Sequence, residues 1–128
     1  MLADDHRMLR EGLSRSMSEH GFDVVGEASD GVEAVAMAHR LTPDVILMDV
    51  SMPEMDGVET LVKINTIDMA HPPVVIMATA YDTSDLEDEL AQQHITVGGV
   101  LTKPFSALTL RDTLHQTLEL DGGIKSAL

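Results

Sequence analysis

Two short, uninterrupted apolar runs, at residues 45–48 and 74–78, constrain the fold more than any other feature of this sequence. A continuous apolar run of this length is typical of a strand that is buried on both faces. The segments around these runs carry apolar residues at helical spacing. Short apolar strands that alternate with amphipathic helices predict βαβ units, and therefore a parallel sheet in an α/β domain.

Reading the whole chain in this way, we expect five strands that alternate with five helices. The predicted strands are residues 1–3, 22–28, 44–49, 74–78 and 100–102. The predicted helices are residues 6–20, 31–40, a short segment after Gly57, 84–93 and 106–120. Residues at the spacing of one helix face are Leu9, Leu13 and Met17 in the first helix, Val32, Val35, Ala36 and His39 in the second, Val58, Leu61 and Ile64 in the third, and Leu110, Leu114 and Leu118 in the last.

Length and composition indicate one globular domain. The chain has 128 residues, of which 44% are hydrophobic, and we assign residues 1–120 to the domain and 121–128 to a C-terminal tail or linker. Its formal charge of −14 argues against direct binding of nucleic acid, which needs clustered Lys and Arg. The sequence has no cysteine, no apolar run long enough to cross a bilayer and no visible signal peptide. We therefore expect a cytoplasmic domain that does not bind membranes.

Polar side chains follow the predicted strands at the point where each strand ends. Asp4 and Asp5 follow the first strand, Asp49 ends the third, Thr79 the fourth and Lys103 the fifth. In open parallel sheets the carboxyl ends of the strands meet at one edge, where ligands bind. Three carboxylates packed there repel one another unless a cation neutralises them, and a set of oxygen ligands suits Mg²⁺.

Taken singly, each of these residues has a simpler structural explanation. The acidic pair could cap a helix, Asp49 could belong to a turn, Thr79 could be an ordinary β-branched strand residue, and Lys103 with the proline after it could form a surface turn. Their joint placement at successive strand ends favours a site. A carboxylate beside Mg²⁺ can attack phosphorus, while a hydroxyl and an ammonium can hold the phosphoryl oxygens.

The ordered set of motifs resembles the receiver domains of two-component signalling. The matching features are Asp4-Asp5, residues 46–57 (ILMDVSMPEMDG), Thr79-Ala80 and residues 103–105 (KPF), and the resemblance extends from Leu2 to about Leu120. It implies a flavodoxin-like fold with a five-stranded parallel sheet of order 2-1-3-4-5 and helices on both faces. It also implies a phosphorelay in which a sensor histidine kinase or a histidine phosphotransfer domain supplies the phosphoryl group.

The resemblance further implies a role for each site residue. Asp49 would be the phosphoacceptor. Asp5, Asp49 and the backbone carbonyl of Ser51 would ligate Mg²⁺, with Mn²⁺ as an alternative, and Asp4 would act through water. Lys103, Thr79 and the backbone N–H of Ala80 would hold the phosphoryl oxygens. The domain would therefore be a signalling phosphoacceptor that catalyses its own phosphorylation and its slow dephosphorylation, and not an enzyme acting on an external substrate. Its oligomeric state is left open between a monomer and a weak dimer.

The chain departs from the family at one position. Val100 occupies the position, three residues before Lys103, where receivers usually carry an aromatic residue that moves on phosphorylation.

Two segments of the chain resemble receivers of different architecture. Residues 100–112 look similar to receivers fused within hybrid histidine kinases, whereas residues 4–13 resemble stand-alone or DNA-linked regulators. Between these two signals, the hybrid-kinase interpretation is slightly favoured.

Two other classes of function compete with a phosphoacceptor. An aspartyl-phosphate hydrolase usually needs a second acid two residues after its nucleophile, and here that position is Ser51. A partner-binding pseudo-receiver would need no chemistry, yet every expected site side chain is present. Both observations favour the phosphoacceptor.

Overall fold

Five parallel strands form one sheet, in the order β2-β1-β3-β4-β5, in the computed structural model of this chain. The structure describes residues 1–52, 55–67, 72–80 and 83–120. The strands are β1 (Leu2–Ala3), β2 (Glu27–Ala28), β3 (Val45–Asp49), β4 (Val74–Thr79) and β5 (Gly99–Thr102). The helices are α1 (Arg7–Glu19), α2 (Gly31–Leu41), α3 (Gly57–Asn65), α4 (Thr83–Gln92) and α5 (Ala107–Leu120). The predicted fold class and strand order are confirmed; the tail assigned to residues 121–128 lies outside the described residues.

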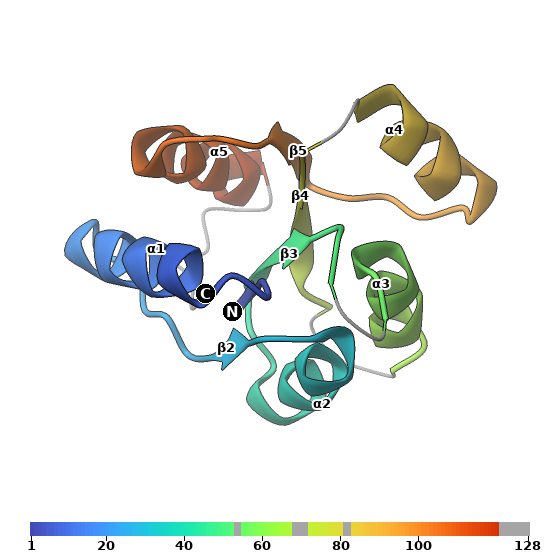
Figure 1. The fold of residues 1–128 in the computed structure, drawn as a ribbon, viewed down its shortest axis with the longest axis horizontal. Coiled ribbons are helices and arrows are strands. Elements are labelled where there is room, and N and C mark those ends of the chain that lie inside the picture. The colour runs from blue at the N-terminus through green and yellow to red at the C-terminus, as the bar shows by residue number, and fades with distance from the viewer. Residues whose placement is uncertain (53–54, 68–71, 81–82, 121–128) are drawn as a thin grey trace.

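The helices form two layers around the sheet. Helices α1 and α5 cover one face, while α2, α3 and α4 cover the other (Figure 1). Successive residues of β3 serve the two layers in turn: Ile46 and Met48 belong to the cluster under α2, α3 and α4, and Val45 and Leu47 to the cluster under α1 and α5. This alternation is the two-residue period of a strand, and it explains why the run at residues 45–48 is apolar throughout.

Two sequence expectations need correction in detail. The second strand is much shorter than the predicted residues 22–28, because the two-residue strand β1 offers ladder partners only to Glu27 and Ala28. The start of that segment instead sends Phe22 into the cluster under α1 and α5. In the second helix, Ala34 and Ala38 are buried, whereas Val32 is 54% exposed, so the helix is rotated relative to the expected apolar face.

Close packing behind β3 requires a residue without a side chain at the start of α3. The Gly57 N–H donates a hydrogen bond to the Val50 carbonyl, 2.8 Å away. A Cβ atom at Gly57 would overlap the carbonyl oxygen of Asp49 and lie 2.9 Å from the Cα of Val50. Because both neighbours are backbone atoms, they cannot move aside as a flexible side chain would. The segment that follows β3 is therefore fixed against α3.

We expect Gly57→Ala to lower the free energy of unfolding by about 1–3 kcal/mol, the usual cost of overpacking. Gly12→Ala is the matched control, because nothing lies within 4 Å of a Cβ there and the residue sits inside α1. That control should gain about 0.5–1 kcal/mol from helix propensity. Urea unfolding monitored by circular dichroism measures both changes. Equal effects of the two substitutions would contradict the close approach at Gly57.

Candidate functional site

The carboxyl ends of four strands bring the predicted residues to one edge of the sheet. Asp4 and Asp5 directly follow β1, Asp49 is the last residue of β3, Thr79 the last of β4, and Lys103 follows β5. Parallel strands place all of these ends on the same side of the domain. Residues that are 99 positions apart in the chain, such as Asp4 and Lys103, are consequently in direct contact.

The centre of this edge is an ion-paired triad. The Lys103 Nζ lies 2.9 Å from Oδ2 of Asp4 and 3.2 Å from Oδ2 of Asp49. The side chain of Asp49 is only 5% exposed and that of Lys103 16%. One ammonium therefore neutralises part of the charge of two largely buried carboxylates, which would be costly without such a partner.

Burial and charge act in opposite directions on this triad. Burial, and then the nearby charge of Asp4, raise the pKa of the Asp49 carboxyl above its usual value, although Lys103 and the Ser51 N–H oppose the shift. Burial alone would lower the pKa of the Lys103 ammonium, but its hydrogen bond to Asp4 and the charge of Asp49 outweigh burial and raise it. One cation is thus too little for these carboxylates, and a further cation would favour the ionised form of Asp49.

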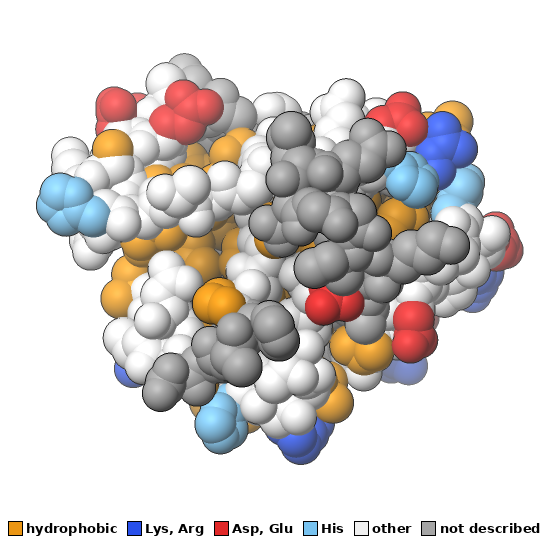
Figure 2. All heavy atoms as spheres, turned by 180° about the vertical axis from the view of Figure 1, so that it is seen from behind, with side chains coloured by type: hydrophobic (Ala, Val, Ile, Leu, Met, Phe, Trp, Pro, Cys, Tyr) orange, Lys and Arg blue, Asp and Glu red, His pale blue; other side chains and the backbone are white. Residues whose placement is uncertain are grey.

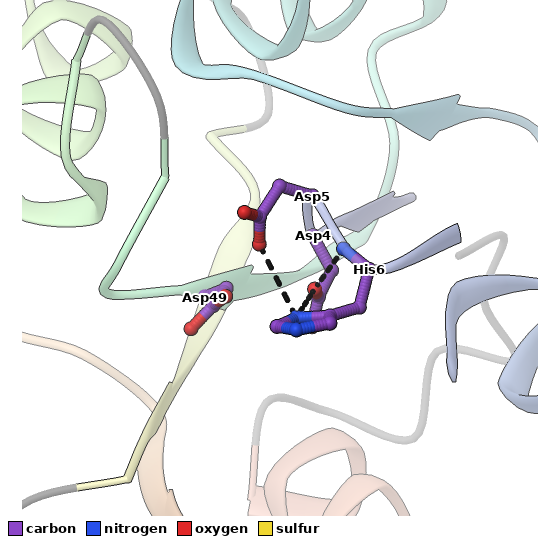
Figure 3. Close-up of side chains that lie close together, drawn as sticks. All are labelled: Asp4, Asp5, His6 and Asp49. Atoms are coloured by element: carbon purple, nitrogen blue, oxygen red, sulfur yellow. Dashed lines mark hydrogen bonds and ion pairs between the residues drawn. The ribbon is translucent and has the colours of Figure 1, made fainter. Parts of the chain in front are cut away.

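The other two side chains of the cluster lie nearer to solvent. The side chain of Asp5 is 35% exposed. The Nδ1 atom of His6 lies 3.4 Å from Oδ1 of Asp5 and 3.5 Å from Oδ1 of Asp4 (Figure 3). One candidate ligand atom from each of Asp4, Asp5, His6 and Asp49 lies within 4.8 Å of the others. Carboxylate oxygens at a partly open edge match the ligands of Mg²⁺, which keeps several of its waters. The donor set therefore fits the expected ion.

The remaining predicted residues border the triad. Ser51 is exposed, and its backbone N–H donates to Oδ1 of Asp49 over 3.3 Å. Thr79 is buried, and its carbonyl accepts a 2.7 Å hydrogen bond from the Lys103 N–H, which joins the ends of β4 and β5. Ala80 is exposed next to it. Val100, in the position expected to hold an aromatic residue, is partly buried against the cluster under α4.

Two residues that surround Asp4 were missed by the sequence reasoning. The guanidinium of Arg10 donates to the Asp4 carbonyl over 2.8 Å and to Glu27 over 3.1 Å, which braces the end of β1 against β2. The backbone N–H of His6 donates to Oδ1 of Asp4 over 2.8 Å. The position of His6 directly after Asp4 and Asp5 was a visible signal for its role. No local pattern indicated the role of Arg10, because its partner Glu27 on β2 is distant in sequence.

With this geometry in hand, comparison with known proteins identifies the family. The family model described as the response regulator receiver domain matches residues 1–115. The chain belongs to the response regulator receiver domain family. Receiver domains are phosphoacceptors of two-component signalling and partners of histidine kinases. This receiver domain is accordingly a signalling phosphoacceptor and not a classical enzyme.

Individual relatives agree with this assignment. The response regulator protein VraR of Staphylococcus aureus is 37% identical over 120 residues, which cover 91% of this chain and 54% of VraR. The receiver domain of AraT from Geobacillus stearothermophilus is 32% identical with a TM-score of 0.77, over 93% of this chain and 91% of that one. Chemotaxis response regulator CheY4 of Vibrio cholerae is 31% identical with a TM-score of 0.81, over 91% and 95%. The receiver domain spans about half the length of the curated relatives it matches.

These comparisons correct one expectation from the sequence. The similarity of residues 100–112 to hybrid histidine kinases favoured a kinase fragment, but VraR and AraT, which this chain resembles over 91% and 93% of its length, are response regulators. The hybrid-kinase interpretation therefore has no support.

The raised pKa of Asp49 generates a stability prediction. The folded receiver domain holds the Asp49 proton more tightly than the unfolded chain does, so this group contributes stability below the unfolded pKa that is lost as pH rises through the folded pKa. At neutral pH without metal, Asp49→Asn should therefore raise the melting temperature by roughly 2–5 °C. The gain should shrink near about pH 4, where the carboxyl in the unfolded chain is itself half protonated.

Differential scanning fluorimetry in EDTA at both pH values measures this difference between variant and wild type. Asp88→Asn, on the exposed side of α4, is the control for the loss of one charge. A lower melting temperature of Asp49→Asn at neutral pH would contradict the balance described here, because Lys103 would then contribute more than burial costs.

Proposed function

We propose that Asp49 is the residue of this receiver domain that accepts the phosphoryl group. The observation that carries this proposal is the position of its carboxylate, which is buried at the end of β3 and held 3.2 Å from the Lys103 ammonium. A histidine kinase is the proposed donor. We also propose that the receiver domain comprises residues 1–120.

In the proposed step, a carboxylate oxygen of Asp49 attacks the phosphorus of a phosphohistidine. The new O–P bond forms as the P–N bond breaks, and the imidazole of the donor leaves with the electron pair of that bond and takes up a proton. The acyl phosphate on Asp49 is later hydrolysed by water. Because the phosphoryl group is anionic, the reaction depends on cationic groups around Asp49 more than on acid–base catalysis.

We assign the metal ligands from the resemblance to receiver domains, and the clustering of Asp4, Asp5 and Asp49 supports the assignment. Asp5, Asp49 and the backbone carbonyl of Ser51 would bind Mg²⁺ directly, with Mn²⁺ as an alternative, and Asp4 would act through a water molecule. When bound, the ion would supply positive charge that offsets the charge of the attacking carboxylate and of the phosphoryl group. The raised pKa of Asp49 supports this assignment, because burial and the nearby charge of Asp4 disfavour the ionised carboxylate and a bound cation would favour it.

The assignment of the phosphoryl-binding groups follows from the strand ends. The Lys103 ammonium already contacts the Asp49 carboxylate, and it would neutralise part of the negative charge of the phosphoryl oxygens. The Thr79 hydroxyl and the Ala80 N–H, at the end of β4, would donate the remaining hydrogen bonds. The hydrogen bond from the Lys103 N–H to the Thr79 carbonyl joins the end of β5 to the end of β4, so that Lys103 lies beside Thr79 and Ala80.

The partner and the cellular setting are proposed from charge and composition. The domain would act in the cytoplasm, where a sensor histidine kinase or a histidine phosphotransfer domain would dock at the edge that holds Asp49. Among the described residues, no helix has the length and apolar character that crossing a bilayer requires. Figure 2 shows Lys and Arg scattered along the rim of one face and mixed with Asp and Glu. This scatter and the net charge of −14 support the proposal that the domain itself does not bind nucleic acid.

Incubation with Mg²⁺ and acetyl phosphate should increase the intact mass by one phosphoryl group, and Asp49→Ala should abolish the increase because it removes the attacking oxygen. Asp23→Ala, an equal loss of charge at an exposed position before β2, should leave the increase unchanged. Mass spectrometry of the intact protein and of its peptides locates the group. Full phosphorylation of Asp49→Ala would refute the assignment.

Asp5→Ala should weaken Mg²⁺ binding by at least roughly tenfold, since it removes a proposed direct ligand. Mg²⁺ should raise the melting temperature of the wild type by neutralising the acidic cluster, and raise that of Asp5→Ala much less. Thermal unfolding over a millimolar titration of Mg²⁺ measures both effects, with Asp88→Ala as the control for charge. A wild type indifferent to Mg²⁺ would count against the proposed site.

A further inference from the structure

The imidazole of His6 faces the acidic pair that follows β1. Its Nδ1 lies 3.4 Å from Oδ1 of Asp5 and 3.5 Å from Oδ1 of Asp4, while 72% of the side chain is exposed (Figure 3). Asp4 reaches this position with its Oδ1 atom, because its Oδ2 atom is held by Lys103. A nitrogen donor and two carboxylate oxygens therefore point toward a common space at the open side of the site.

The separations of these donor atoms distinguish between kinds of coordination. Ligands about 2.0–2.2 Å from a tetrahedral Zn²⁺ are roughly 3.3–3.6 Å apart along the edge of the tetrahedron. Adjacent ligands of octahedral Mg²⁺, at about 2.0–2.1 Å, are only roughly 2.8–3.0 Å apart. The distances of 3.5 and 3.4 Å from the His6 Nδ1 to Oδ1 of Asp4 and Oδ1 of Asp5 match the tetrahedral edge. A water molecule would complete such a site.

We infer that the imidazole of His6 is a nitrogen ligand of the proposed cation site of this receiver domain. This ligand increases the affinity of the site for Zn²⁺ and similar first-row divalent ions relative to its affinity for Mg²⁺. The inference rests on the proposed metal site, because Asp5 is shared by both ions. Imidazole suits Zn²⁺, whereas Mg²⁺ prefers oxygen ligands and retains water. Zn²⁺ held by His6, Asp4 and Asp5 would therefore compete with Mg²⁺ for the same acidic pair.

The test measures the effect of removing the imidazole and not the absolute preference. Even a site of oxygen ligands alone binds Zn²⁺ more tightly than Mg²⁺, following the general order of divalent affinities. His6→Ala should weaken Zn²⁺ binding at least roughly tenfold at fixed pH, while the affinity for Mg²⁺ changes less than about twofold. Isothermal titration calorimetry for Mg²⁺ and competition with a chromogenic chelator for Zn²⁺ provide the two affinities.

His39→Ala is the matched control, because it removes an exposed imidazole from the end of α2. It should leave both affinities unchanged. Co²⁺ provides a second readout, since tetrahedral Co²⁺ absorbs visible light far more strongly than octahedral Co²⁺. The wild type and His39→Ala should show the strong absorption with one equivalent of Co²⁺, and His6→Ala should lose it.

Equal Zn²⁺ affinity of the wild type and His6→Ala would overturn the inference. A parallel loss of Mg²⁺ affinity in His6→Ala would also overturn it, because the imidazole would then act on the acidic pair and not as a selective ligand. These outcomes are separable from failure of the proposed function. If Asp5→Ala leaves the affinity for both ions unchanged, the proposed metal site itself is wrong; if it weakens both while His6→Ala weakens neither, only the role of His6 is wrong.

Discussion

The contact of the Lys103 ammonium with Asp4 and Asp49 holds together the part of this domain on which its function depends. Lys103 follows β5, Asp4 follows β1 and Asp49 ends β3. A single ammonium group therefore links three strand ends that are far apart in the sequence. The link is electrostatically incomplete, because one positive charge serves two buried carboxylates. Burial of Asp49, together with the nearby charge of Asp4, raises the pKa of Asp49 and leaves the site disposed to take up a further cation.

Rigid packing on both faces of the sheet makes such a crowded arrangement possible. β3 is buried along its whole length, and Gly57 lets the first turn of α3 approach the backbone directly behind Asp49. Arg10 joins the end of β1 to β2 from the side of α1. The packing keeps the strand ends that carry the carboxylates close together, and protonation or the binding of a cation relieves the repulsion between them.

The sequence supported some parts of this description better than others. The apolar run at residues 45–48 predicted a fully buried strand, because a strand covered on both faces needs no polar position. The amphipathic helices were predicted within one or two residues at most ends. The length of the second strand was overestimated, because it depends on the two residues of β1 as ladder partners. The buried face of α2 was misplaced because it is formed by alanines, which carry a weak hydrophobic signal. Although His6 directly follows the acidic pair, it was not recognised at the site, because adjacency in sequence does not determine which way its ring turns.

The sequence by itself determined the class of fold, the strand order implied by the family resemblance, and the residues that lie at the strand ends. It could do so because apolar periodicity and the order of motifs are local properties of a chain. Only the tertiary structure decided which charges pair and how well they are balanced. The distances from Lys103 to Asp4 and Asp49, and from His6 to the acidic pair, depend on how β1, β3 and β5 are placed side by side. Electrostatic interactions vary with distance and burial, and neither quantity is encoded in the spacing of residues along the chain.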